Sequence, residues 1–185
     1  MTVVKKLTIL NILIYILTVI LQNLNIDVIN TFALFPTNSD NYSYYQWVTH
    51  MFLHGSTLHI LFNMLALYTI GPHVESYFKK NFIIFYILCG IGASLIQFLF
   101  VPNSALIGAS GAIFGIIIVY ALLNPNKKLF LFLILPIKSK ILIPLILIFE
   151  LYAGLFTSGD GIGHMAHVGG AISGFLYFLL SKLNK

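Results

Sequence analysis

The chain has 185 residues, of which 59% are hydrophobic and only 8% are charged, and its mean hydropathy is +0.96. A soluble domain carries roughly 25% charged residues, so this composition excludes a soluble globular protein and indicates a membrane protein. The net charge of +5 comes from lysines dispersed in pairs. Because they are not clustered, they do not indicate a nucleic-acid-binding surface.

The first predicted element is a transmembrane helix over residues 7–23. Lys5 and Lys6 precede this apolar run, as basic residues do in a secretory signal peptide. The run is longer than the roughly 7–15 apolar residues of a signal peptide, and no small-residue cleavage site follows it. We therefore expect a helix that is retained in the membrane.

Further apolar segments follow at about 58–77, 82–100, 109–123, 140–156 and 166–182. Each is close to the about 20 residues that a helix needs to cross the hydrocarbon core. The segment 129–140 is also apolar, but Pro136 interrupts it, which favours an interfacial or half-inserted segment over a seventh span. The sequence thus predicts an all-α membrane protein in which residues 1–185 form a single bundle of six transmembrane helices.

Lysine placement predicts the orientation. All ten basic residues are lysines, and with six spans every one lies on the side of the N-terminus. The opposite loops, 24–57, 101–108 and 157–165, contain none. The positive-inside rule then predicts a multi-pass protein of the plasma membrane with both termini in the cytoplasm. The long first outer loop, 24–57, is rich in aromatic residues, so we expect it to lie in the membrane interface.

Polar residues on three predicted helices share one depth. The second, fourth and sixth spans all run inward from the outer face. Asn63 lies about 9 Å into the second span, at a rise of about 1.5 Å per residue, while Ser110 begins the fourth span and His167 begins the sixth. Polar residues within a membrane span are costly and indicate function. We therefore expect one site near the outer face.

The residue types in this layer suit nucleophilic catalysis. A serine hydroxyl becomes a good nucleophile when a base, usually histidine, takes its proton. Ser110 is therefore the candidate nucleophile and His167 the candidate base. The backbone N–H of Ser110 and the side-chain amide of Asn63 are candidate donors to the oxyanion of a tetrahedral intermediate. His59, one helical turn before Asn63, is a third candidate donor.

No aspartate or glutamate is expected beside His167, so the sequence predicts a Ser–His dyad. Glu150 lies in the fifth predicted span, either facing a water-filled site or acting as a protonated structural donor. His164 is an alternative base, but it precedes the sixth span and lacks the glycine context of His167. Phe114 lies one turn after Ser110 and is expected to pack against the imidazole ring.

Glycines explain how two helices could approach closely enough for a Ser–His hydrogen bond. Gly111 and Gly115 form a pair of small residues four apart, and so do Gly170 and Gly174. Such pairs let helix backbones pack closely in membranes. Gly108 and Gly111 also permit a tight turn from the loop into the fourth helix.

Three motifs in this order resemble those of the rhomboid family of intramembrane serine proteases. The segment "GASG" at 108–111 matches the family's G-x-S-G nucleophile motif. The segment "AHVGGAISG" at 166–174 matches the A-H-x-x-G-x-x-x-G motif of its last helix, and "HILFN" at 59–63 matches its H-x-x-x-N element. The resemblance extends over essentially the whole chain and includes the six-span topology.

The resemblance implies an enzyme that hydrolyses peptide bonds in or next to transmembrane segments of other membrane proteins, without a cofactor or metal. It implies that Ser110 is the nucleophile and His167 the base, with His59 and Asn63 in the oxyanion hole. It also implies that water reaches the site from the outer face and that a segment near the fifth helix gates access for substrates.

Two positions depart from the family pattern. Aligned on Thr49, Tyr45 and Gln46 stand where many members have Trp-Arg in the first outer loop. The aromatic residue four positions after the serine is often tyrosine in the family, whereas Phe114 keeps the ring and lacks the hydroxyl.

Two other functions fit the composition. One is a catalytically silent rhomboid-like protein that binds or escorts membrane clients, although such relatives usually lack the serine or the histidine. The other is a small transporter or channel, for which internal repeats and charges at the midplane are typical; neither is evident. The histidines are spread over two layers without an H-E-x-x-H motif, so no metal site is predicted. No particular oligomeric state is predicted.

Overall fold

The structure is a computed structural model that describes residues 1–131, 134–157 and 159–183. Parts of the segment 129–140 and of the loop 157–165, and Lys185, therefore lie outside the described residues. The elements in chain order are α1 Val3–Asn23, α2 Val28–Phe32, α3 Gln46–Thr49, η1 His50–Phe52, α4 Thr57–Phe78, η2 Lys79–Asn81, α5 Phe82–Phe100, α6 Ser110–Leu123, β1 Lys128–Leu131, β2 Leu135–Lys138, α7 Ser139–Phe156 and α8 His164–Leu183.

A long helix lies at each predicted span, and the apolar helices indicate a multi-pass membrane protein. Among the described residues, four stretches are long and apolar enough to cross a membrane, judged by length and composition. One of them, Thr57–Phe100, contains both α4 and α5. The helix α6 has 14 residues, so it is only about 21 Å long at the usual helical rise.

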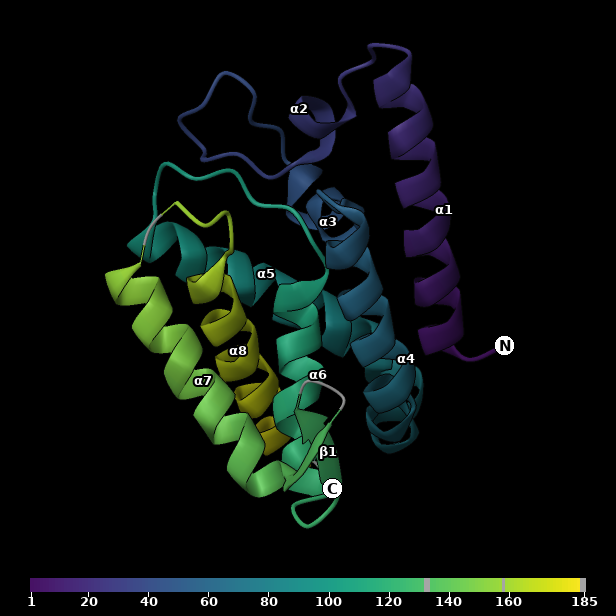
Figure 1. Ribbon diagram of the computed structural model, residues 1–185, viewed down its shortest axis with the longest axis vertical. Coiled ribbons are helices and arrows are strands. Elements are labelled where there is room, and N and C mark those ends of the chain that lie inside the picture. The colour runs from purple at the N-terminus through teal and green to yellow at the C-terminus, as the bar shows by residue number, and fades with distance from the viewer. Residues whose placement is uncertain (132–133, 158, 184–185) are drawn as a thin grey trace.

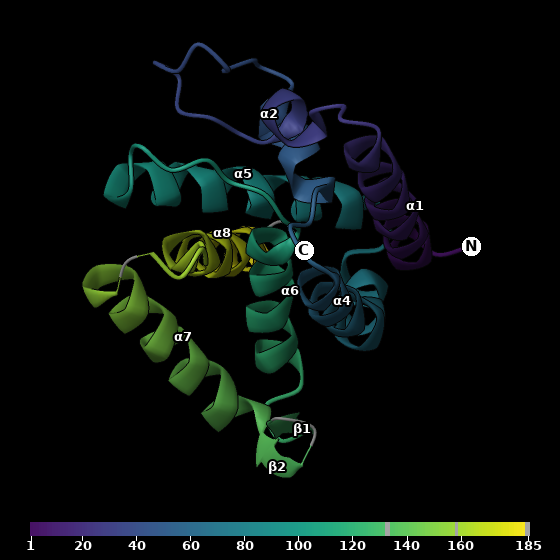
Figure 2. The same ribbon diagram turned by 45° about the horizontal axis from the view of Figure 1, so that its top comes forward.

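The short helix α6 lies in the middle of the bundle, between α4 and α8, with α5 beside it (Figures 1 and 2). Its buried residues include Ile113, Ile116, Val119 and Tyr120, which pack in the main hydrophobic core with residues of α4 and α5. Because its neighbours surround it, α6 is shielded from lipid and does not need the length of a lipid-exposed span.

The periphery of the bundle is apolar. Along α7, the side chains of Leu145, Ile148, Phe149 and Phe156 are all exposed, and α1 presents a similar exposed apolar face. A soluble protein rarely exposes apolar patches of this extent. Such a surface is stable in the hydrocarbon core of a membrane, because its apolar side chains are not exposed to water there.

The lysine-free loops gather at one end of the molecule. Figure 1 shows the chain between α1 and α4, the loop before α6 and the loop before α8 at one end, with the β1–β2 strands at the other. Backbone hydrogen bonds join two of these loops, because Leu34 and Leu106 exchange N–H···O bonds of 3.0 and 2.9 Å. The loop that leads into α6 is therefore held by the first loop.

The side chain of Gln46 braces the first loop from inside. It is fully buried, and its Oε1 accepts hydrogen bonds from the backbone N–H groups of Phe35 and Ser43 at 3.3 and 3.1 Å. Its Nε2 donates to the backbone oxygens of Thr31 and Asn41 at 3.2 and 2.8 Å. This amide ties together distant points of the first loop.

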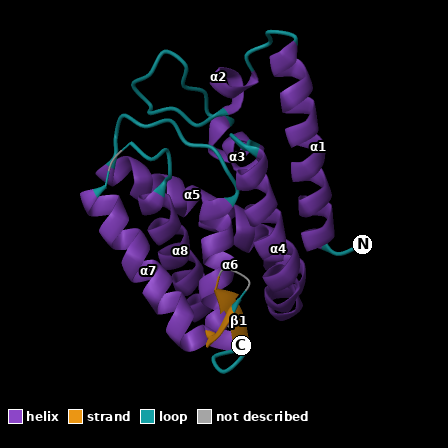
Figure 3. Cartoon of the chain, in the orientation of Figure 1, coloured by secondary structure: helices purple, strands orange, loops and turns teal. Residues whose placement is uncertain are grey.

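The apolar segment after α6 forms a β-hairpin. Strand β1 pairs antiparallel with β2, so that Lys128 lies opposite Lys138 (Figure 3). Pro136 lies in β2, and a residue without an N–H is tolerated in a strand that has a free edge. That this segment lies in the membrane interface stays a prediction.

Glu75 near the end of α4 fastens the start of α1. Its carboxylate accepts hydrogen bonds from the backbone N–H groups of Val3 and Val4 at 2.7 and 3.0 Å. These N–H groups have no partner within their own helix, and a negative charge is favourable at a helix N-terminus.

Candidate active site

Ser110 is the first residue of α6, and a constrained loop delivers it there. The backbone N–H of Gly108 donates to the oxygen of His50 at 2.9 Å. Gly108 has φ +117°, a left-handed backbone conformation that only glycine adopts readily. The motif glycine therefore allows the sharp turn that points the chain into α6.

The structure brings Ser110 and His167 together. Ser110 Oγ lies 2.9 Å from His167 Nε2, although the two residues come from α6 and α8. Both lie in the bundle at the end that carries the lysine-free loops. At this distance a serine hydroxyl can donate to an unprotonated Nε2, which is the arrangement needed for proton transfer to the imidazole.

The paired glycines of α6 and α8 make this distance possible. A Cβ built on Gly170 would lie 1.8 Å from the backbone oxygen of Gly111, and one on Gly174 would lie 2.6 Å from Gly115 Cα. The two helix backbones therefore touch at both pairs. Any larger side chain would push the helices apart, and the serine and histidine with them.

Phe114 defines the plane of the His167 ring. The two rings are stacked, with centroids 4.3 Å apart and planes 9° from parallel. Since Phe114 lies one turn after Ser110 on α6, the helix that carries the nucleophile also supports the imidazole.

Glu150 contacts the other side of the imidazole. Its Oε2 lies 2.9 Å from His167 Nδ1, so the expectation that no aspartate or glutamate lies beside His167 is wrong. Glu150 lies nearly two turns before the C-terminal end of α7, and α7 packs against α8, which carries His167. An acid buried in a membrane span is the signal that could have identified it from the sequence.

The alternative base, His164, does not reach the serine. Its Nδ1 lies 2.6 Å from Glu150 Oε2 and its Nε2 lies 2.9 Å from Asp160 Oδ2. Each ring nitrogen of His164 thus faces a carboxyl oxygen, and neither faces Ser110. The hydrogen bond from His164 lowers the pKa of Asp160 from its ordinary value.

Among the described residues, Glu150, His164 and His167 form a candidate metal site. One ligand atom each from Glu150, His164 and His167 lies within 4.8 Å of the others. Histidine nitrogens and a carboxylate oxygen are ligands that zinc accepts. In the structure these atoms are instead joined by hydrogen bonds, with both Nδ1 atoms on the same oxygen.

Two candidate oxyanion donors, His59 and Asn63, lie on α4. The Nδ2 of Asn63 donates to the backbone oxygen of His59 at 3.0 Å, which leaves one amide hydrogen for a ligand. A Cβ on Gly108 would lie 2.7 Å from His59 Nε2 and 3.8 Å from Ser110 Oγ. The His59 ring and the serine hydroxyl therefore flank the same glycine. The described contacts include no direct bond from Asn63 to Ser110.

In its neutral form, the His59 ring carries its proton on Nε2 and can donate a hydrogen bond from that atom. Its Nδ1 accepts a long hydrogen bond of 3.4 Å from the backbone N–H of Gly55, so the proton of a neutral ring lies on Nε2. The neighbouring His54 ring meets His59 edge-on, with centroids 4.9 Å apart. Neither buried nitrogen of His54 has a hydrogen-bond partner of good geometry among the described residues, and burial lowers its pKa to about 4.

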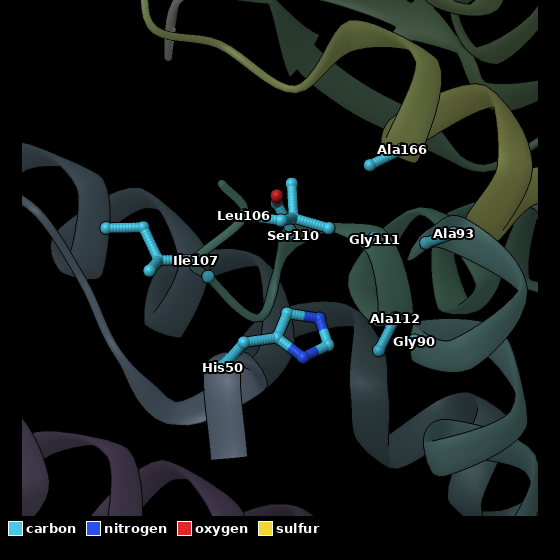
Figure 4. A pocket seen from close by; sticks show the side chains of 10 residues that line it. His50, Gly90, Ala93, Leu106, Ile107, Ser110, Gly111, Ala112 and Ala166 are labelled. Carbon is cyan, nitrogen blue, oxygen red and sulfur yellow. The ribbon is translucent and has the colours of Figure 1, made fainter. Parts of the chain in front are cut away.

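A small cavity lies beside Ser110 (Figure 4). Its volume is about 10 Å³, which is close to the space for a single water molecule. His50 lines it and is fixed by Gln46 O at 2.7 Å from Nδ1 and by Ser94 Oγ at 3.1 Å from Nε2. Burial lowers the pKa of His50 to about 4, so a neutral ring borders the cavity near neutral pH.

Comparison with known proteins points to one family. The profile of the Rhomboid domain matches residues 41–182. The chain is similar to "Rhomboid protease GluP" of Bacillus subtilis (strain 168), with 36% identity over 135 residues, covering 71% of this chain and 25% of that protein.

Plant proteins show comparable similarity. "RHOMBOID-like protein 4" of Arabidopsis thaliana is 35% identical over 126 residues, covering 67% of this chain and 30% of that protein. "Rhomboid-like protein 11, chloroplastic" of the same plant is 32% identical over 151 residues, covering 76% and 54%. The chain thus matches between a quarter and about half of the length of these relatives.

Proposed function

The chain belongs to the rhomboid family, and from that premise we propose that it is an intramembrane serine endopeptidase. Its substrates are transmembrane proteins, which it cleaves in or near their membrane-spanning segments. One observation carries the proposal: Ser110 Oγ lies 2.9 Å from His167 Nε2 at the start of two touching helices. A protein that only binds clients has no use for a base aligned on a hydroxyl.

The proposed chemistry follows from these contacts. His167 Nε2 takes the hydroxyl proton of Ser110 as Oγ attacks the carbonyl carbon of the scissile bond. The oxyanion that forms accepts hydrogen bonds from the backbone N–H of Ser110, the Nε2–H of His59 and the free amide hydrogen of Asn63. The imidazolium then returns its proton to the leaving amine, and water hydrolyses the acyl-enzyme with His167 again as base.

The proposed topology completes this assignment. We propose that α1, α4, α5, α6, α7 and α8 all cross the membrane as one domain, with both termini in the cytoplasm. The lysine-free loops then face outward in the plasma membrane, and water reaches Ser110 from that side. The clustering of these loops at one end of the bundle supports this orientation (Figure 1).

A fluorophosphonate probe tests whether Ser110 is activated. Wild type, Ser110→Ala and His167→Ala are reconstituted in liposomes, treated with the probe and analysed by mass spectrometry. We expect an adduct on Ser110 in wild type, none at this position in Ser110→Ala, and slow labelling in His167→Ala. Wild type that labels no faster than Ser110→Ala would instead favour the client-binding alternative.

A further inference from the structure

We propose that Glu150 is a positioning residue that holds His167 for Ser110, so that the site works as a Ser–His–Glu triad rather than a dyad. The proposal rests on the proposed protease function and extends it to a residue on α7. Its basis is an unbroken series of contacts: Ser110 Oγ to His167 Nε2 at 2.9 Å, and His167 Nδ1 to Glu150 Oε2 at 2.9 Å.

The position of Glu150 demands an explanation. The residue is 8% exposed and lies within an otherwise apolar helix. A carboxylate in that setting is stable only where donors surround it. Two imidazole nitrogens supply these donors by converging on the same carboxylate oxygen. A glutamate that served only to join helices would not need to contact the ring that faces the nucleophile.

His164 and Asp160 hold the carboxylate in place. His164 Nδ1 lies 2.6 Å from Glu150 Oε2 and its Nε2 lies 2.9 Å from Asp160 Oδ2, so the ring bridges the two carboxyl groups. The oxygen of Glu150 that contacts His167 is thereby held by a second imidazole ring. Because Asp160 is in the outer loop and Glu150 is in α7, this anchor also connects the loop to the site.

The contact with Glu150 determines which nitrogen of His167 carries the proton. A carboxylate oxygen accepts from Nδ1–H, so Nε2 keeps its lone pair toward the serine hydroxyl. Stacking on Phe114 sets the plane of the ring, and the hydrogen bond to Glu150 sets its rotation within that plane. The same carboxylate then stabilises the imidazolium that forms when His167 takes the proton from Ser110.

Substitutions at Glu150 test this role in liposomes that contain a transmembrane substrate. Glu150→Gln keeps the shape and a neutral acceptor, and we expect kcat to fall about tenfold or more while KM is unchanged. Glu150→Leu removes the acceptor, and we expect a loss of about a hundredfold or more. The control Leu151→Ala changes an exposed residue of the same turn and should cleave at the wild-type rate.

The outcomes separate this proposal from the proposed function. No cleavage by wild type contradicts the protease assignment itself. Cleavage by wild type and by Glu150→Gln at equal kcat overturns the triad alone, and so does a change confined to KM, which would indicate a role in substrate access. Activity should persist in a chelator, and its loss would assign the cluster to a bound metal instead.

A second measurement observes the His167 ring in the wild-type protein, and a variant serves only to assign its signals. Histidine is labelled with an NMR-visible nitrogen isotope, and the His167 signals are assigned by their absence in His167→Ala. At a pH where the ring is neutral, we expect the proton on Nδ1 and a bare Nε2. A proton on Nε2 would show that Glu150 does not orient the ring, and would overturn the proposal.

Discussion

Replacing Gly170 with alanine should separate the two catalytic helices. The new Cβ would lie 1.8 Å from the oxygen and 2.7 Å from the carbonyl carbon of Gly111. Both are backbone atoms of α6, so no side-chain rotation relieves the overlap. A carbon–oxygen contact needs about 3.3 Å, so the helices must move apart by roughly 1.5 Å at this point.

That movement sets the size of the effect. A shift of this size extends the 2.9 Å contact between Ser110 and His167 to about 4 Å, beyond the range of a hydrogen bond. Misplacement of a catalytic group by about 1 Å lowers the rate on the order of a hundredfold. Overpacking also lowers the free energy of unfolding by roughly 1–3 kcal/mol.

The assay compares cleavage of a transmembrane substrate and the thermal unfolding midpoint of Gly170→Ala with a matched glycine variant on α7. In Gly154→Ala the new Cβ would lie 2.5 Å from Met165 Sδ, the flexible part of a side chain that can move aside. We expect the control to keep its activity. The reasoning is refuted if Gly170→Ala cleaves as fast as the control.

Three further predictions concern α1, the first loop and the loop that leads into α6. Glu75→Ala removes the charged acceptor from the first backbone N–H groups of α1, so the free energy of unfolding in detergent should fall by roughly 2 kcal/mol. Burial lowers the pKa of His50 from 6.5 to about 4. As the pH falls, His50 therefore binds a proton in the unfolded chain at a higher pH than in the folded protein. Stability is therefore full above pH 6.5 and falls by roughly 3 kcal/mol as the pH drops to about 4, whereas the unfolding midpoint of His50→Gln should change less with pH. Gly108→Ala places a Cβ at φ +117° and 2.7 Å from His59 Nε2, so probe labelling of Ser110 should slow; labelling at the wild-type rate would contradict the role of this turn.

The sequence was sufficient to identify the family and the helices. Continuous apolar runs predict membrane helices, because a helix that crosses the bilayer needs about 20 apolar residues. Residues that favour turns mark where these helices end. Serine and histidine motifs flanked by glycines predicted which helices touch, since only glycine allows such close backbone contact. The match to the Rhomboid domain confirms the resemblance.

The buried acid Glu150 was visible in the sequence, but its contact with His167 could not be predicted in the same way. The position of a residue along a helix predicts its depth in the membrane. It does not predict which neighbouring helix the side chain faces. The packing of α7 on α8 sets that direction, and no local pattern encodes it. The same limit applies to Gln46, whose partners lie up to 15 residues away within the first loop.

Cleavage of a transmembrane substrate in liposomes, by wild type and by Ser110→Ala, shows whether the protein is a protease with Ser110 as its nucleophile. Removing one oxygen atom from Ser110 leaves the packing of α6 and α8 unchanged, so both proteins should fold and bind alike. We expect products with wild type and none above background with Ser110→Ala. Equal product formation by the two proteins would contradict this expectation.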